Sequence, residues 1–250
     1  MIQSKAIVLA ASLSAALLAP PAFAIPAAVQ DFEDGTAEGW TFGGGPGGVP
    51  STPQTVASGG AGGADDEYMR LTSNGTSGPG SKLSAINASA WGGNYTDAGL
   101  TTIDMDLRNF GASDLYVRLL LLDLSGLPQA LYAITDAVFL PSGGDWTAVT
   151  FSVTAADLIA LEGDPAALLQ SVTELRILGS ADPNWLFKPG EQPSVTAVLG
   201  VDNITPNVFG DGDGDNEVPE PSTGWLLVAG LVAATARARN RLSSAARSPT

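Results

Sequence analysis

Residues 100–123 read LTTIDMDLRN-FGASD-LYVRLLLLD and hold the two clearest strand patterns of the chain. In the first ten residues, Ile103, Met105 and Leu107 alternate with polar or charged residues. Side chains alternate between the two faces of a strand, so this pattern predicts a strand with one face in the core and one in water. Residues 117–122 are almost continuously apolar, which indicates a central strand covered on both faces.

The remainder of the chain extends this β pattern. It contains 30 glycines and 17 prolines, which favour short strands joined by tight turns. Further strands are expected at residues 28–33, 67–72, 131–139, 146–153, 174–178 and 197–205. One helix is expected over residues 166–172, because Asp164 and Pro165 form an N-cap with proline at the first helical position. Another turn or two of helix is expected within residues 154–161, and a mobile loop within the glycine-rich residues 43–63.

Many strands and little helix predict an all-β fold, a two-sheet antiparallel sandwich with one or two short helices. Three segments strengthen this expectation: DFEDG at 31–35 with Gly39-Trp40, WTAVTFSV at 146–153, and VDNI at 201–204. Together they resemble the jelly-roll modules of the galactose-binding and carbohydrate-binding type, over about residues 28–206. The resemblance implies a jelly-roll body.

Those modules often hold a structural calcium ion where the first and last strands meet, and the resemblance implies Glu33, Asp34 and Asp202 as its carboxylate ligands. Calcium requires hard oxygen donors of this kind. The alternative interpretation is that Asp34 and Gly35 form a turn and that Asp202 caps a strand end.

The N-terminus has the pattern of a signal peptide. Lys5 precedes an apolar run over residues 6–19, and Ala22-Phe23-Ala24 supplies the small-x-small pattern of a signal peptidase site. Cleavage after Ala24 is expected, which assigns residues 1–24 to the signal peptide.

The C-terminus has an ordered set of three features: Val218-Pro219-Glu220-Pro221, an apolar run over residues 224–236, and a basic cluster of Arg237, Arg239 and Arg241. Thirteen helical residues span roughly 20 Å, short of the roughly 30 Å hydrocarbon core. The set resembles the PEP-CTERM sorting signal of exported proteins in Gram-negative bacteria. The resemblance implies a transmembrane-type helix and cleavage near the Pro-Glu-Pro motif by an exosortase, a membrane peptidase. An ordinary tail anchor or a buried helix is the alternative.

These assignments divide the chain into a signal peptide, a sandwich domain over 25–209, an acidic flexible linker over 210–217, the sorting signal over 218–241 and a disordered tail over 242–250. The linker has aspartate at alternate positions, as in the start of an EF-hand loop. However, Asn216 stands where that loop needs glycine and Ser222 where it needs glutamate. A solvated linker is therefore expected.

Composition limits the function of the body. The whole chain has 11 basic and 26 acidic residues, and Lys5, Arg237, Arg239, Arg241 and Arg247 lie in the removable ends, leaving a net charge of −20. Such a body repels nucleic acid and anionic lipid and attracts divalent cations. The absence of histidine and cysteine excludes disulfides, Ser-His-Asp and Cys-His catalysis and the usual zinc sites.

Two kinds of ligand site remain open. Asp104 and Asp106 resemble half of a glycosidase arrangement, although a solvated strand face is the simpler interpretation. Two aromatic groups could form platforms for sugar: Trp91 with Asn94 and Tyr95, and Trp185 with Asn184 and Phe187. For Trp91, packing over a sheet edge is the alternative. Trp40 and Trp146 are expected in the core.

The sequence therefore predicts an exported, non-enzymatic protein that passes through an inner-membrane intermediate to the cell surface or extracellular matrix. There its body would act in adhesion, carbohydrate contact or matrix structure, and extracellular polysaccharide is the expected ligand. Signal peptidase and an exosortase are the expected processing partners. The alternative is a carboxylate-dependent hydrolase acting on matrix polysaccharide.

Overall fold

The computed structural model describes residues 25–26, 28–42, 53–76, 80–186 and 192–208 of the chain. These residues form strands and one short helix, α1 (Pro165–Leu168). The strands are β1 (Thr41–Phe42), β2 (Gln54–Val56), β3 (Tyr68–Asn74), β4 (Leu83–Asn87), β5 (Leu100–Asn109), β6 (Leu115–Asp123), β7 (Leu131–Ile134), β8 (Val138–Leu140), β9 (Thr147–Ser152), β10 (Ile159–Glu162), β11 (Glu174–Ser180) and β12 (Thr196–Val208). The two predicted long strands, β5 and β6, are confirmed at both of their ends.

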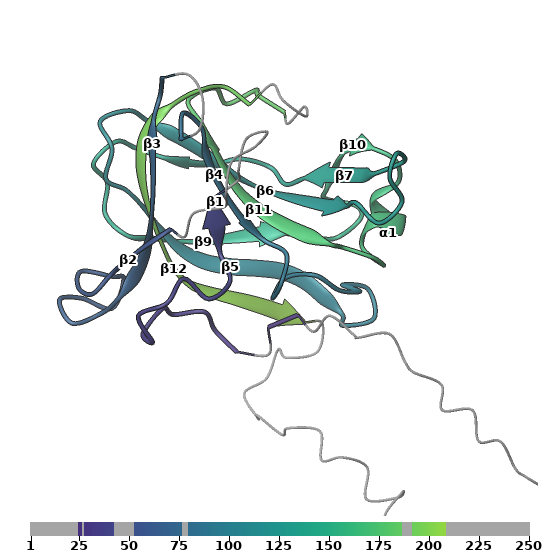
Figure 1. Cartoon of the computed structure of the whole chain (residues 1–250), viewed down its shortest axis with the longest axis horizontal. Helices are drawn as coiled ribbons and strands as arrows, with labels where there is room; N and C mark the ends of the chain where they lie inside the picture. The colour runs from purple at the N-terminus through teal and green to yellow at the C-terminus, as the bar shows by residue number, and fades with distance from the viewer. Residues whose placement is uncertain (1–24, 27, 43–52, 77–79, 187–191, 209–250) are drawn as a thin grey trace, which may run out of the picture. The chain divides into compact units, whose positions relative to one another are not determined.

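The strands form two antiparallel sheets that pack face to face (Figure 1). One sheet has the order β1-β4-β11-β6-β7-β10, with β8 beside β7 on the same edge of β6. The other has the order β2-β3-β12-β5-β9. From β3 to β6 the chain crosses from one sheet to the other at every step, which is the double-sheet jelly-roll arrangement. The predicted all-β antiparallel sandwich is confirmed.

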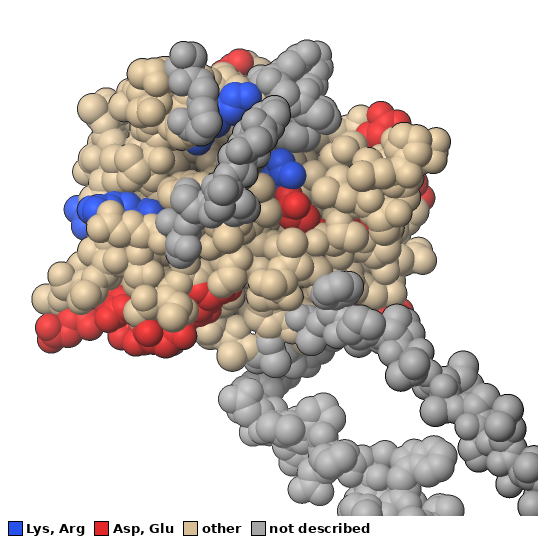
Figure 2. All heavy atoms as spheres, viewed as in Figure 1, with Lys and Arg blue, Asp and Glu red and all other residues tan. Residues whose placement is uncertain are grey.

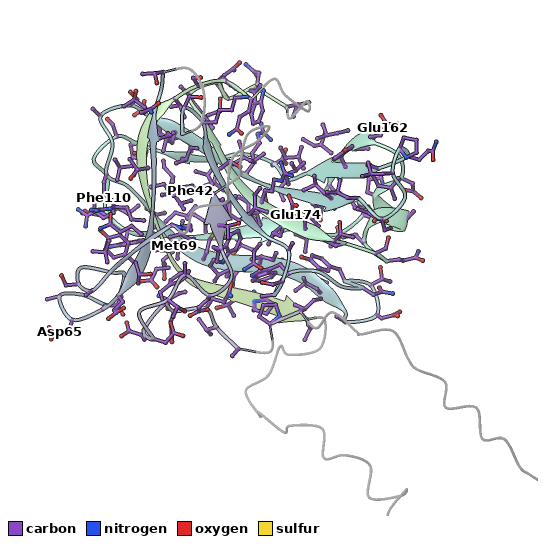
Figure 3. All side chains as sticks on the ribbon, viewed as in Figure 1. Phe42, Asp65, Met69, Phe110, Glu162 and Glu174 are labelled. Atoms are coloured by element: carbon purple, nitrogen blue, oxygen red, sulfur yellow. The ribbon has the colours of Figure 1, made fainter. Side chains whose placement is uncertain are left out.

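The core lies between the two sheets and follows from the alternation in β5. Ile103, Met105 and Leu107 are at most 2% exposed and face the inner sides of β6 and β11. Met69 of β3 lies in the same layer, as Figure 3 shows. In β6 the residues that face this core alternate with Leu120 and Leu122, which are also buried but belong to a second apolar cluster on the opposite side of the sheet. The prediction that β6 is covered on both faces is confirmed.

The strand predicted at residues 28–33 is wrong apart from its centre. Gln30 forms one bridge with Ile204 of β12, and the chain then turns. Phe32 has a φ of 62°, and its carbonyl oxygen accepts a hydrogen bond from Gly35 N at 3.0 Å. A positive φ turns the backbone, so the residues after Phe32 cannot continue along the strand.

Other differences have local causes. Residues 131–139 form two strands, since Thr135 Oγ1 accepts a hydrogen bond from Leu119 N and interrupts the ladder between β7 and β8. The expected helix is a single turn, because Thr173 N already bonds to Leu122 O and draws the chain into β11. Residues 159–162 form β10 rather than helix. Residues 54–56 form β2 within the segment predicted as a mobile loop. Strands β1 and β4 were not predicted.

Candidate functional site

The predicted calcium ligands lie at the end of the sandwich where the first described segment meets β12, but they do not form one cluster. Asp34 Oδ1 accepts hydrogen bonds from Thr36 N and Thr36 Oγ1 at 2.8 and 2.7 Å, and these bonds lower the pKa of Asp34. Glu33 Oε1 accepts a hydrogen bond from Glu67 N at 2.8 Å. Asp34 therefore stabilises a turn, as the alternative interpretation expected, whereas Glu33 holds the backbone just before β3.

Asp202 has a different environment. It is 1% exposed, and its two oxygens accept hydrogen bonds from Ala61 N and Asn203 N at 2.9 and 2.8 Å. Burial raises the pKa of Asp202 most, the two backbone donors oppose this rise, and the neighbouring Asp66 carboxylate adds to it; the resulting pKa is about 7. Two carboxylates in contact cannot both ionise without a proton or a cation between them.

The space beside this pair is lined by oxygen. A Cβ added to Gly60 would collide with Asp66 Oδ2, the Glu67 carbonyl oxygen and Asp202 Oδ2. These are the hard donors that calcium prefers. The donor chemistry fits calcium at Asp66 and Asp202 rather than at the predicted trio, although no group of three or more acidic side chains within the described ranges is arranged to hold an ion. Figure 2 shows acidic side chains gathered at the lower left of the view, where Figure 3 labels Asp65.

The platform predicted at Trp91, Asn94 and Tyr95 is wrong. Trp91 and Tyr95 are fully buried. The Gln30 side-chain oxygen accepts hydrogen bonds from both Trp91 Nε1 and Trp40 Nε1, at 2.7 and 3.0 Å, and Tyr95 Oη donates to Trp91 O. The Asn94 side chain donates a hydrogen bond to Asp97 Oδ2 and accepts one from Asp97 N. Since their polar atoms are satisfied inside the protein, these rings pack the core, as the packing alternative for Trp91 stated.

The second predicted aromatic, Trp185, lies on the outer face of the seven-stranded sheet. It packs, together with Tyr132, against the buried cluster of Leu120, Leu122, Ile134 and Leu178. Phe187, its predicted neighbour, lies outside the described residues. A solvated sheet face normally carries polar side chains, so an apolar cluster on the side opposite the core is informative. We call this surface the outer apolar face.

The sheet register explains how the outer apolar face is built. Leu120 of β6 lies opposite Arg176 of β11 on one side and Ile134 of β7 on the other, and Leu122 lies opposite Glu174 and Tyr132. Arg176 and Glu174 form an ion pair in the middle of the face, where Figure 2 shows a basic and an acidic group side by side and Figure 3 labels Glu174. A row of apolar and aromatic side chains therefore borders a charged pair that is partly exposed to solvent.

Arg118 fixes one side of this face. It is 7% exposed and donates to the Thr135 and Pro183 carbonyl oxygens, both at 2.8 Å. Burial lowers the pKa of Arg118, and Asp136 opposes this effect. Through Pro183, this arginine holds the segment that carries Trp185 against the sheet. Trp185 was predicted from its polar and aromatic neighbours, whereas Tyr132 was not, because one aromatic residue within a strand has no distinctive pattern.

The outer face of the five-stranded sheet is polar. Asp106 Oδ2 accepts a hydrogen bond from Asn203 Nδ2 at 3.0 Å, and Asp104 Oδ1 is shielded from solvent without a hydrogen-bond partner in the described structure. The two carboxylates lie two residues apart on one strand face. Beside them, Phe110 and Trp146 pack against Gly200, so that Trp146 is half-buried on this face rather than in the core as expected. Trp40 is in the core, as predicted.

A cavity of about 360 Å³ lies between the loop before β5, the segment after β9 and α1. Its lining includes Leu100, Val153, Leu169, Thr96 and Gln170 but no aspartate or glutamate. It therefore offers no carboxylate acid or base.

Comparison with known families identifies the C-terminal segment. Residues 217–241 are a PEP-CTERM protein-sorting motif. This confirms the predicted sorting signal, including Val218, Pro219, Glu220, Pro221 and the basic cluster of Arg237, Arg239 and Arg241. The motif indicates a secreted protein that is processed by an exosortase. The predicted apolar helix of this motif and the signal peptidase site at Ala22 and Ala24 lie outside the described residues. Within the described ranges, none of the helical structure is long and apolar enough to cross a membrane.

Solved structures with a similar arrangement of strands include two carbohydrate-binding modules. The family 11 module of a Clostridium thermocellum cellulosomal cellulase is 12% identical, with a TM-score of 0.43 over 74% of this chain and 96% of the module. A family 28 module specific for non-crystalline cellulose is 14% identical, with a TM-score of 0.44 over 76% of this chain and 99% of the module.

An exo-beta-agarase is 11% identical, with a TM-score of 0.48 over 72% of this chain, and this chain spans only 25% of its length. Among curated proteins, none matches this sequence.

Proposed function

We propose that this protein is exported, is cut by an exosortase near Pro219-Glu220-Pro221 after an inner-membrane intermediate, and acts at the cell surface or in the extracellular matrix by contacting polysaccharide without hydrolysing it. The sorting motif at residues 217–241 supports the route. The outer apolar face supports the contact and is the observation that carries this part of the proposal.

Polysaccharide suits this face for chemical reasons. The apolar C–H surface of a sugar ring packs on aromatic side chains, which Trp185 and Tyr132 supply, and sugar hydroxyls need donors and acceptors, which Arg176 and Glu174 supply. With a net charge of −20 the processed chain, residues 25–220, repels nucleic acid, whereas a neutral glycan is not repelled. Half-buried aromatic rings beside a partly exposed charged pair therefore favour a sugar chain over other polymers.

The placement of Asp104 and Asp106 favours binding over hydrolysis. Retaining glycosidases hold two carboxyl groups about 5–5.5 Å apart and inverting ones about 6.5–9.5 Å apart, on either side of the bond that breaks. Asp104 and Asp106 instead lie along one strand face, and Asp106 is bound to Asn203. The hydrolase alternative predicts that Asp104→Asn and Asp106→Asn abolish polysaccharide turnover. We expect no turnover by the parent protein.

The route is tested by intact-mass measurement of the protein recovered from cells and from medium. The expected secreted species begins at Ile25 and ends close to Glu220. Deletion of the exosortase, or removal of residues 218–241, should stop this trimming. A secreted species that keeps Arg237 to Arg241 would contradict the proposed processing.

The contact is tested by affinity electrophoresis in gels that contain the polysaccharide of the producing cells. Trp185→Ala and Tyr132→Ala should each weaken retardation, because stacking on an aromatic ring contributes about 0.5–1.5 kcal/mol beyond area burial. Trp185→Phe keeps an aromatic ring and is the matched control. Equal retardation of the parent and of a folded double alanine variant would remove this part of the proposal.

We also propose that calcium binds at Asp66 and Asp202 and stabilises the body. The fit of the donors at Gly60 supports this, with the Glu67 carbonyl oxygen as a further ligand. Calcium at millimolar concentration should raise the melting temperature of the parent protein and of Asp104→Asn, but not of Asp202→Asn. An equal rise in all three proteins would contradict the site.

A further inference from the structure

Asn74 differs from the other asparagines of the chain, because it is the one that is followed by glycine. It is exposed, and it is the last residue of β3, at the point where the chain turns. Its backbone is held on two sides: Asn74 N donates to Gly80 O at 2.8 Å, and Asn74 O accepts a hydrogen bond from Thr196 Oγ1 at 3.1 Å. The side chain of Asn74 therefore meets solvent from a fixed backbone.

The turn requires glycine at residue 75. Gly75 has a φ of 67°, in the left-handed region that favours glycine. A Cβ at this position would lie 2.3 Å from Thr196 Oγ1 and 2.8 Å from Thr196 N. The peptide nitrogen of Gly75 consequently has no side chain beside it, and no described residue accepts a hydrogen bond from it. This nitrogen is open to the side chain of the preceding Asn74.

The Asn74 amide is held so that its carbonyl carbon can react. Asn74 Oδ1 accepts hydrogen bonds from Thr76 N and Thr76 Oγ1 at 3.0 and 2.8 Å. These bonds direct the side chain forward along the chain, toward the Gly75 peptide. They also stabilise the negative charge that develops on Oδ1 when a nucleophile adds to Cγ. Among the described residues, none accepts a hydrogen bond from Asn74 Nδ2, so this group is free to leave.

We propose that the folded, secreted protein deamidates at Asn74. Gly75 N attacks Asn74 Cγ and loses its proton, a succinimide ring forms, and Nδ2 leaves as ammonia. Water then opens the ring at one of its two carbonyl carbons. The product is either aspartate or isoaspartate, and in isoaspartate the main chain passes through Cγ. Water is the co-reactant, and the product has one more negative charge than the parent. This proposal is independent of polysaccharide and calcium binding.

Asn87, Asn94 and Asn203 are protected from this reaction. Asn87 is fully buried. Asn94 Nδ2 donates to Asp97 Oδ2 at 2.8 Å, and Asn203 Nδ2 donates to Asp106 Oδ2 at 3.0 Å. Tyrosine follows Asn94 and isoleucine follows Asn203, and these side chains shield the peptide nitrogen that would have to attack. We expect these three residues to keep their amides, and Asn94 provides the matched control.

The test incubates the folded, processed protein at neutral pH in water labelled with heavy oxygen, and follows it by intact mass and peptide mapping. The peptide that contains Asn74 should gain the label, and an isoaspartyl methyltransferase should then methylate it. Asn74→Gln should lose both signals, because its longer side chain cannot form the succinimide. Asn94→Gln should react at the same rate as the parent.

A synthetic peptide of residues 70–76 serves as the unfolded reference under the same conditions. The parent protein itself gives the decisive result, so the proposal does not depend on how well a variant folds. If Asn74 of the folded parent stays unlabelled while the peptide is converted, the proposal is overturned. Labelling of Asn94 or Asn203 as fast as that of Asn74 would also overturn it.

Discussion

The outer faces of the two sheets differ in polarity. On the seven-stranded sheet, Leu120, Leu122 and Leu178 are buried although they point away from the core, and Trp185 packs over them. On the five-stranded sheet, the corresponding face carries Asp104 and Asp106. Sheets of one sandwich share the same core, so this difference does not arise from the fold. It shows that the outer side of one sheet carries a second, covered apolar layer, whereas the outer side of the other carries charged groups.

The largest effect that tests this contrast is expected from a charge in the outer apolar face. Leu120→Asp should destabilise the protein by about 3 kcal/mol or more, because it removes apolar contacts and buries an unpaired carboxylate. Thr72→Asp, at an exposed position of β3 on the other outer face, should change stability by about 0.5 kcal/mol or less. Urea unfolding followed by tryptophan fluorescence measures both. Equal losses would mean that the two faces do not differ.

The next effect concerns the aromatic cluster of Phe110 and Trp146 on the outer face of the five-stranded sheet. A Cβ at Gly200 would collide with the rings of Phe110 and Trp146, so Gly200→Ala should cost about 1–3 kcal/mol. In a Trp146→Ala background the same substitution should cost less, since one of the colliding rings is gone. Urea unfolding of the four proteins of this double-mutant cycle measures the coupling. Strict additivity would contradict the close packing of these rings on β12.

A smaller effect is expected from pH at the end of the polar sheet. The pKa of Asp202 is raised from 3.8 to about 7, so the folded state binds this proton more tightly than the unfolded state does. Without added calcium, the contribution of this group to stability is fully present below about pH 4 and is lost as the pH rises toward 7. Asp202→Asn should therefore reduce the difference in urea midpoint between pH 5 and pH 8. An identical difference in the parent and the variant would show that Asp202 does not titrate in this range.

The smallest effect is expected at the margin of the outer apolar face. Phe139 is 49% exposed and meets Tyr116 with ring centroids 5.3 Å apart. Phe139→Ala should cost about 1 kcal/mol or less, because half of the ring already contacts water. The same urea measurement applies. A loss of stability as large as that of Leu120→Asp would mean that Phe139 belongs to the buried cluster.

The parts of the fold that the sequence predicts are those in which local pattern and final environment agree. The alternation of β5 and the apolar run of β6 each describe the faces that those strands bury, and both strands were predicted at their observed ends. Strand β4 could not be predicted in this way, since its short segment gives only a brief alternation. Phe32 shows the other limit: its positive φ depends on Glu38, whose carboxylate accepts the Phe32 N–H from six residues away.

The candidate sites were predicted less well for the same reason. Trp91 lies in a glycine-rich segment that is typical of an exposed loop, but Gln30, which is far away in sequence, provides an acceptor for its indole inside the protein. Asp202 was identified from its motif, whereas its partner Asp66 meets it only after β2 and β3 have paired. The sorting motif is the opposite case, because a membrane peptidase reads it as a linear sequence and no folding is needed to recognise it.

The position of β12 has a consequence for export. It is the last strand of the body, yet it lies between β3 and β5 in the middle of the five-stranded sheet. A chain that crosses a membrane from its N-terminus onward delivers this strand last, so the sheet has a gap at its centre until residue 208 has emerged. The sandwich therefore closes only when the sorting motif, nine residues further along the chain, has reached the translocation channel.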